Sequence, residues 1–393
     1  MTSIAFFRSF WDEVKQTPQW ATMEQTVEGS EWHREANVAV HTTMAIEHYI
    51  GNTAQHRTER EQLMTLMTLL FHDFGKPEAE ETLEAKDGSG RTYHRYAGHE
   101  PVSANEFISF VCDHEILMKK FFARGFGWDD IMKIKFMIEH HLPFGLKNVT
   151  KRQNLRNTVE ETLGWAEQCF YDQLWSDCCG RISDNHQQKK IDSAAWIEEF
   201  RAMPTTATKE PKASAPVMYV LCGVVGAGKS TWTKRLRGMN PNQKMIVVSE
   251  DDYRFEFAGL NFTPAQLCEW TALPSMKDQY AMAWKFCFDN SGAYDKYAKA
   301  KLAEAVESGV TLVLDRTNQT RKSRGPWITA AKSKGYKIVA VQFYVSESVM
   351  HARQKTRNDK DVPHHRAHQI FMAMETPWYP VEVDEIEVVP PWN

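Results

Sequence analysis

One eight-residue segment constrains the fold of this chain more than any other. Residues 223–230 have the sequence Gly-Val-Val-Gly-Ala-Gly-Lys-Ser, directly after the apolar run 217–222 and before a helix-like stretch. A glycine-rich loop between a strand and a helix allows backbone N–H groups to surround a phosphate. We predict a site for ATP or another nucleoside triphosphate, in which Lys229 bridges the β- and γ-phosphates and Ser230 binds Mg²⁺. The predicted nucleotide-binding residues are Gly223, Gly226, Ala227, Gly228, Lys229, Ser230 and Thr231.

The length of 393 residues exceeds what a single core usually holds, so two domains are expected. Residues 201–216 contain three prolines and few large apolar side chains, which is typical of a linker. We therefore assign one domain to residues 1–200 and a second to residues 217–393. No apolar run has the length needed to cross a bilayer, and residues 1–11 lack a signal pattern. We expect a cytoplasmic protein with no membrane partner.

The two halves differ in hydrophobic periodicity. In the first half, Leu63, Leu66, Met67 and Leu70 follow the spacing of one helix face, and the sequence predicts an all-α domain. In the second half, β-rich runs at 217–222, 245–248, 311–314 and 338–345 alternate with helical stretches near 295–308 and 364–374. Such alternation predicts an α/β domain with a parallel sheet.

The charge of the chain is unevenly distributed. Residues 211–393 hold 24 Lys and Arg against 19 Asp and Glu, although the whole chain carries a net charge of -4. A basic second half suits a polyanionic partner, but solvated surface charge gives the same count. The charge pattern alone leaves both explanations open.

Polar residues follow three elements of the predicted sheet, at the edge where ligands of parallel α/β folds bind. They are the run Ser-Glu-Asp-Asp-Tyr-Arg at 249–254, the run Asp-Arg-Thr-Asn at 315–318, and two arginines on a late helix. Together with the loop at 223–230 they resemble the 5′-hydroxyl polynucleotide kinase family over about residues 217–380. The resemblance implies seven catalytic residues: Lys229, Asp251, Arg254, Asp315, Asn318, Arg353 and Arg357.

The resemblance also implies a role for several of these residues. Asp251 is expected to take the proton from the attacking 5′-hydroxyl, and Arg254 to bind the neighbouring phosphate of the acceptor. Arg357 resembles the lid arginine of the family, and Arg353, one turn earlier, is expected to share its helix face. Arg316 is an insertion relative to the simplest form of the family's Asp-x-Thr-Asn element. Which of residues 315–318 faces the acceptor therefore stays open.

The residues before the linker include His41, the pair His72-Asp73, His99, the pair His140-His141 and Asp177. This set resembles the HD phosphohydrolase superfamily over about residues 30–190. The resemblance implies two metal sites that share Asp73, one with His41, His72 and Asp177, and one with His99, His140 and His141. These ligands suit one or two ions of Mn, Fe, Co, Ni or Zn without distinguishing among them. Because neighbours on a helix point about 100° apart, we expect one of His140 and His141 to bind metal and the other to face substrate. Lys76 is a candidate for a phosphate contact.

The combination looks like the HD-domain polynucleotide kinases, which repair broken ends of RNA or DNA. That resemblance implies ATP-dependent phosphorylation of 5′-hydroxyl ends and metal-dependent removal of 3′-phosphate or 2′,3′-cyclic phosphate, with a separate ligase acting afterwards. Two alternatives are a nucleotide-regulated HD phosphohydrolase acting on nucleotides and a small-molecule P-loop kinase. A scaffolding nucleic-acid binder is a further reading, disfavoured by two complete catalytic sets. The choice between RNA and DNA and the oligomeric state stay open.

Overall fold

The structure is a computed structural model that describes residues 1–28, 34–84, 90, 92–205 and 215–391. The chain divides into two compact units, Met1–Thr208 and Lys209–Asn393. Of the predicted linker 201–216, the first two residues belong to a helix, and residues 206–214 lie outside the described residues. Within the described ranges, no helix combines the length and the apolar character that a membrane span requires.

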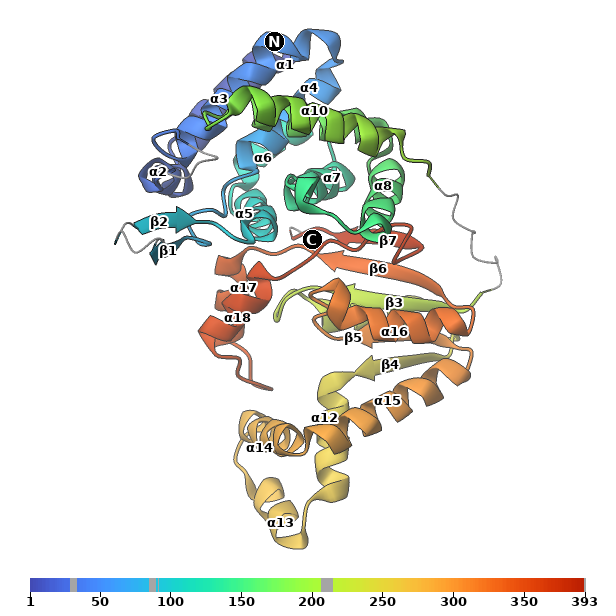
Figure 1. Ribbon diagram of the computed structural model, residues 1–393. Coiled ribbons are helices and arrows are strands. Elements are labelled where there is room, and N and C mark those ends of the chain that lie inside the picture. The colour runs from blue at the N-terminus through green and yellow to red at the C-terminus, as the bar shows by residue number, and fades with distance from the viewer. Residues whose placement is uncertain (29–33, 85–89, 91, 206–214, 392–393) are drawn as a thin grey trace. The chain divides into compact units, whose positions relative to one another are not determined.

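In the described part of the first unit, the secondary structure is helical apart from one small β-strand pair and an isolated bridge between Val27 and Asn37 (Figure 1). Strands β1 (Glu81–Glu84) and β2 (Thr92–Arg95) pair antiparallel, so the prediction of an all-α domain missed a short β element. Both strands are mostly exposed and carry no apolar alternation, which is why periodicity did not reveal them. The helices are α1 (Ser3–Val14), α2 (Pro18–Gln25), α3 (Val38–Asn52), α4 (Glu59–Phe71), α5 (His99–Asp113), α6 (Glu115–Phe122), α7 (Trp128–Glu139), α8 (Val149–Leu163), α9 (Glu167–Cys179) and α10 (His186–Ala202), with short 3-10 turns at Ala54–His56, Pro143–Gly145 and Gly164–Ala166.

Helix α4 lies at the centre of this unit and contacts α1, α3, α7 and α9. Thr58 caps its first turn and Glu61 completes a reciprocal capping box, which fixes where the helix begins. Every residue from 63 to 71 is buried, so the helix is surrounded on all sides. The residues that follow its last turn are therefore delivered into the interior of the unit.

The second unit contains a parallel sheet with the strand order β4-β5-β3-β6-β7 among the described residues. The strands are β3 (Val217–Cys222), β4 (Met245–Ser249), β5 (Thr311–Asp315), β6 (Lys337–Phe343) and β7 (Glu385–Val389). Four of them match the β-rich runs in the sequence, whereas β7, a partly exposed edge strand, was not predicted. The helices are α11 (Lys229–Met239), α12 (Glu250–Asn261), α13 (Pro264–Ala272), α14 (Met276–Asp289), α15 (Ser291–Glu307), α16 (Arg321–Ser333), α17 (Glu347–Lys355) and α18 (His364–Met372).

Helices α12, α13 and α14 form an arm that extends from the β4 edge of this sheet (Figure 1). The arm is held by contacts of α12 with α14 and α15, and α15 in turn packs on β4. Phe257 and Cys287 of the arm are buried in the same apolar core as the sheet. The arm is therefore part of the second unit and borders the edge where β4 ends.

Candidate functional site

The loop at 223–230 has the backbone geometry that phosphate binding requires. Gly226 and Gly228 have φ values of 79° and 99°, which favour glycine, and Gly228 caps the N-terminus of α11. A Cβ at Gly223 would lie 2.8 Å from Cβ of Phe343, so a side chain there would clash. The loop thus presents the start of α11, with its partial positive charge, to a cavity of about 1440 Å³.

Lys229 lies over the loop. Its Nζ donates to the carbonyl oxygens of Gly223 and Val224, each at 2.8 Å. Burial, helped by Lys360 and Arg357 and opposed by Asp315, lowers the pKa of Lys229 to about 8. An anionic ligand in the cavity, such as a triphosphate, would raise the pKa of Lys229 again and keep its ammonium group protonated.

The end of β4 places Asp251 and Arg254 in the first turn of α12. Ser249 caps this helix by accepting from the N–H of Asp252 at 3.2 Å. Asp251, Arg254 and Lys229 line the same cavity. The side chain of Asp251 retains 35% of its exposure. The structure therefore brings the predicted base and the phosphate loop to one open cavity, as their placement after parallel strands implies.

Both carboxylate oxygens of Asp251 have partners. Its Oδ1 accepts from the hydroxyl of Tyr280 at 2.8 Å and from Arg254 at 3.0 Å, while Oδ2 forms an ion pair with Lys360. Burial acts to raise the pKa of Asp251, but Lys360, Tyr280 and Arg254 outweigh it, so the net pKa lies below the usual value. Asp251 is therefore ionised at neutral pH, as a proton acceptor must be.

Sequence reasoning missed three residues of this site, namely Lys360, Tyr280 and Glu250. Glu250 accepts from Arg254 at 2.5 Å and from Arg316 at 2.5 Å. Tyr280 comes from α14, and Lys360 follows α17, so both are distant from Asp251 in sequence. Only the arm and the loop after α17 bring them together, and no local motif signals them.

The two late arginines lie differently from the prediction. Arg353, on α17, donates to the carbonyl of Gly226 at 3.0 Å and so supports the phosphate loop. Helix α17 ends at Lys355, and Arg357 lies beyond it, paired with Asp359. The prediction that the two arginines share one helix face is therefore wrong. Both nevertheless line the cavity.

The residues after β5 divide into two roles. Asp315 accepts from the hydroxyl of Ser230 at 3.3 Å, which places both beside the loop as candidates for holding Mg²⁺. Asn318 is 3% exposed, has a φ of 47°, and donates to the carbonyls of Leu221 and Leu314. Its amide nitrogen thus ties two strand ends together, Asn318 also belongs to the lining of the cavity, and its catalytic role stays a prediction.

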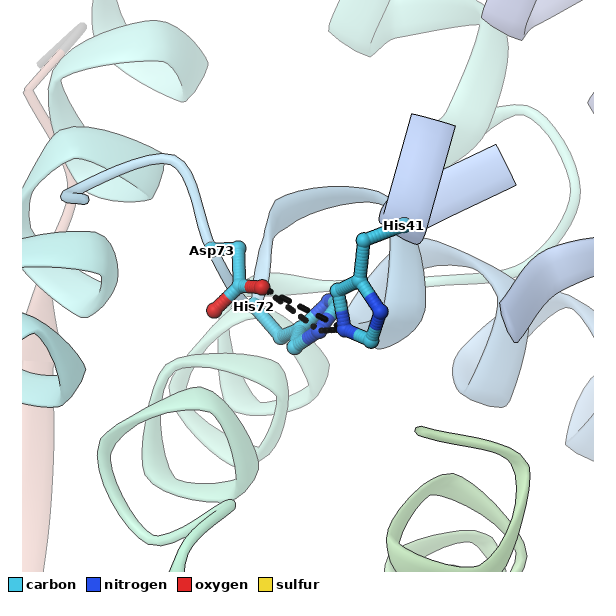
Figure 2. A group of neighbouring side chains, drawn as sticks. All are labelled: His41, His72 and Asp73. Atoms are coloured by element: carbon cyan, nitrogen blue, oxygen red, sulfur yellow. Dashed lines mark hydrogen bonds and ion pairs between the residues drawn. The ribbon is translucent and has the colours of Figure 1, made fainter. Parts of the chain in front are cut away.

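In the first unit, three predicted ligands converge in the interior (Figure 2). His72 caps the C-terminus of α4, Asp73 follows it, and His41 lies on α3. Oδ2 of Asp73 lies 3.2 Å from Nε2 of His72 and 3.5 Å from Nε2 of His41. Asp177, on α9, joins this group through its Oδ1, which is 2.9 Å from Nε2 of His41.

The other oxygen of Asp73 faces a second group. Its Oδ1 lies 3.1 Å from Nε2 of His99 and 3.6 Å from Nε2 of His141, and those two nitrogens are 3.1 Å apart. The described residues thus contain two buried His and Asp clusters that share Asp73, each able to hold an ion. They correspond to the division implied by the sequence except that His140 belongs to neither, and they leave the identity of the metal open.

Backbone carbonyls orient the imidazoles of these clusters. Nδ1 of His72, of His99 and of His141 each lies 2.7 Å from a carbonyl oxygen, of Leu69, Tyr96 and Ile138 respectively. If Nδ1 carries the proton, Nε2 is left with its lone pair toward the cluster. This arrangement fits a metal ion without further rearrangement of the rings.

The electrostatics of the site favour bound positive charge. Burial acts to lower the pKa of His72, but Asp73 and Asp177 raise it to about 10. Lys76 is 3% exposed, and its Nζ lies 2.5 Å from Glu28 and 2.9 Å from Asp73. Two carboxylates thus engage Lys76, whereas we had predicted a phosphate contact. A bound divalent cation would supply the positive charge that protonated His72 and Lys76 provide beside these carboxylates. It would also displace the proton of His72.

His140 lies outside both clusters of the described residues. Its Nδ1 is 2.9 Å from the carbonyl of Phe136, and its ring stacks on that phenylalanine with centroids 4.4 Å apart. Helix α7 ends at Glu139, before both histidines, and only His141 turns toward Asp73. Glu28 and Glu35, which contact Lys76 and His41, were not predicted because nothing in their local sequence marks them.

Comparisons with known proteins address mainly the second unit. Residues 218–377 match the AAA domain family AAA_33, so the second unit carries a P-loop kinase-like domain. No curated protein shows a significant match to the chain. Similar solved structures include one from the PezAT toxin-antitoxin system of Streptococcus pneumoniae, at 15% identity and a TM-score of 0.34, over 50% of this chain and 76% of the other. Another is a gluconokinase from Sinorhizobium meliloti 1021, at 18% identity and a TM-score of 0.26, over 45% and 84%. Likenesses this distant carry no functional argument.

Proposed function

We propose that the second unit transfers the γ-phosphoryl group of ATP to the 5′-hydroxyl end of a nucleic acid. The observation that carries this proposal is the shared cavity of Lys229 and Asp251, whose lining includes both a phosphate loop and an ionised carboxylate. A nucleotide sensor needs no such carboxylate. The described lining also contains eleven Lys and Arg side chains against six Asp and Glu, which favours a polyanionic acceptor over a neutral small molecule.

The chain's residues perform the transfer as follows. Asp251 accepts the proton of the acceptor hydroxyl while the hydroxyl oxygen bonds to the γ-phosphorus and the bond to the ADP oxygen breaks. Lys229 and the N–H groups of the loop hold the β- and γ-phosphates in line with that oxygen. Mg²⁺ bound at Ser230 would neutralise charge on the phosphates. Arg357 supplies positive charge to the transferring group from the segment after α17.

We further propose that the first unit is a metal-dependent phosphoesterase of the HD type, which removes 3′-phosphate or 2′,3′-cyclic phosphate from the same class of nucleic acid. Its support is the pair of clusters around Asp73, whose imidazole and carboxylate donors suit divalent transition metals. Such ions supply a hydroxide from bound water near neutral pH. His41, His72, His99, His141 and Asp177 would hold them.

The kinase proposal is tested by incubating the protein with γ-labelled ATP, Mg²⁺ and a 5′-hydroxyl oligonucleotide, RNA and DNA in parallel. We expect label transfer, reduced about 10²–10⁴-fold in Asp251→Asn. The matched control is Glu256→Gln, which alters an exposed carboxylate on the same helix and should leave the rate unchanged. Transfer to neither strand would contradict the proposal, as would label on small hydroxy compounds alone.

The phosphoesterase proposal is tested with 3′-phosphorylated and 2′,3′-cyclic phosphate RNA and a panel of Mn²⁺, Ni²⁺, Co²⁺ and Zn²⁺. We expect phosphate release or ring opening that Asp73→Ala abolishes. Asp192→Ala, at a carboxylate of α10 whose Oδ1 is bonded to Gln188, is the matched control. Release that persists in Asp73→Ala would exclude this site as its source.

A further inference from the structure

The arm formed by α12–α14 carries most of the exposed large apolar side chains of the second unit. Among the described residues of the second unit, Met239 is the one exposed large apolar side chain outside the arm. The five within the arm are Leu260, Leu267, Met276, Trp284 and Phe288. Trp284 and Phe288, which retain 46% and 66% of their exposure, are the two aromatic members. A concentration of this kind marks a binding surface rather than scattered surface residues.

The two exposed rings belong to a row that starts at the candidate base. Tyr280, Trp284 and Phe288 are spaced four residues apart on α14, so they follow one face with a rise of about 6 Å per step. The hydroxyl of Tyr280 donates to Asp251. Trp284 also lines the cavity, and its ring stacks on Phe288 with centroids 5.3 Å apart and planes at 12°. The row therefore leads outward from the point where the acceptor hydroxyl would lie.

The other faces of α14 hold the helix in place. Ala283 and Cys287 are buried, and Phe286 packs on Phe257 and Phe262. Trp284 and Phe288 are thus not needed to close the core, and their exposure is a consequence of how α14 is anchored. Lys277, one turn before Tyr280, lines the cavity at the same side.

We propose that Trp284 and Phe288 form a stacking platform for the bases next to the 5′ end of a single-stranded acceptor, an inference that rests on the proposed kinase activity. Stacking on exposed rings beside a basic groove is how proteins bind single strands without reading their sequence. Charge complementarity favours this occupant, since the described lining of the cavity has an excess of five basic side chains.

The test compares three acceptors in steady-state kinase assays: adenosine 3′-monophosphate, a ten-nucleotide deoxyadenylate, and the same strand with abasic second and third positions. For the wild type we expect a lower KM for the intact strand than for either other acceptor. Trp284→Ala and Phe288→Ala should each raise the KM of the intact strand about 5- to 150-fold, the range of one lost stacking contact, with kcat retained. Trp284→Tyr should restore most of the affinity, and Met239→Ala is the control for an exposed apolar side chain elsewhere in the unit.

Each outcome is decisive. Equal effects of Trp284→Ala on the intact and abasic strands, or no effect on either, would overturn the platform while leaving the kinase proposal intact. Absence of transfer to any acceptor by the wild type would instead refute the proposed function itself. Sedimentation of the wild type as a dimer, with Trp284→Ala and Phe288→Ala as monomers, would assign the surface to a second copy of the chain and overturn the inference.

Discussion

Asp73 is the one carboxylate that both His clusters of the first unit share, and its two oxygens face different clusters. Oδ2 lies within 3.5 Å of Nε2 of His41 and of His72, and Oδ1 within 3.6 Å of Nε2 of His99 and of His141. Replacing Asp73 by alanine should therefore impair two ions at once. His41→Ala and His99→Ala should each impair one.

The magnitude follows from the number of ligands. With Asp177 included, the cluster of His41 has four protein donors, and the cluster of His99 has three, so the loss of one leaves three or two. Loss of an outer-shell partner alone costs about 10- to 100-fold in metal affinity, and loss of a direct ligand should cost at least that much. With Mn²⁺ set about tenfold above the wild-type dissociation constant, a 10-fold loss of affinity leaves a site about half occupied, and a 100-fold loss leaves it about one tenth occupied. Equilibrium dialysis should therefore find close to two ions in the wild type, between about 1 and 1.5 in each single-cluster variant, and about one or fewer in Asp73→Ala.

Two controls keep this result interpretable. His48→Ala changes a histidine of the same helix as His41 that belongs to neither cluster, and it should bind two ions. Asp73→Ala also leaves Lys76 with fewer partners in the interior, at a cost of about 3–5 kcal/mol for a broken buried ion pair. Thermal unfolding without metal, and Asp73→Asn as a milder variant, check that the unit is folded. A folded Asp73→Ala protein that retains one ion at wild-type affinity would refute the shared-carboxylate reasoning.

Three further predictions concern the second unit. Phosphate binding favours protonated Lys229, whose pKa is about 8 in the free protein, so ADP affinity should be flat up to pH 7 and weaken by up to about tenfold per unit above pH 8. In Lys229→Met this pH dependence of ADP affinity should vanish. If it persists, a group other than Lys229 causes it. Lys360→Met removes a cation that lowers the pKa of Asp251, so the acid limb of the kinase rate should move to higher pH; an unmoved limb contradicts the coupling. Arg324 is fully buried and pairs with Glu382 at 2.5 Å and 3.0 Å. Arg324→Met should therefore lower the free energy of unfolding of the unit by about 3–5 kcal/mol, measured by urea unfolding, because it leaves the Glu382 carboxylate without its partner. Adding Glu382→Gln should restore part of that loss.

The phosphate loop was predictable because its function is written into local backbone geometry. Gly226 and Gly228 occupy positive φ, and Gly223 lies where a side chain would meet Phe343, so the residue types themselves encode the shape. Asp251 was predictable for a different reason: residues that follow parallel strands meet at one edge of the sheet. Neither argument extends to Lys360, since its contact with Asp251 depends on where the loop after α17 lies.

Two of the errors share one physical origin, which is the point where a helix ends. Arg353 and Arg357 would share a face on a continuous helix, but α17 stops at Lys355 and separates them. His140 and His141 follow the last residue of α7, and only His141 turns toward Asp73. Helix ends depend on capping contacts and on tertiary packing, which periodicity does not register.

Most ligands of the metal clusters also lie at helix ends, which are the positions that periodicity predicts least well. His72 and Asp73 adjoin the last turn of α4, His99 opens α5, and His141 follows α7. At such positions backbone carbonyls are available as partners, and they fix Nδ1 of each of the three imidazoles. A ligand in mid-helix has no such partner from its own backbone, and His41, on α3, instead has Glu35 at 3.5 Å from its Nδ1. Glu35 thus lies on the Nδ1 side of His41, where carbonyls lie beside the other three rings, a position that no spacing in the sequence would have assigned to it.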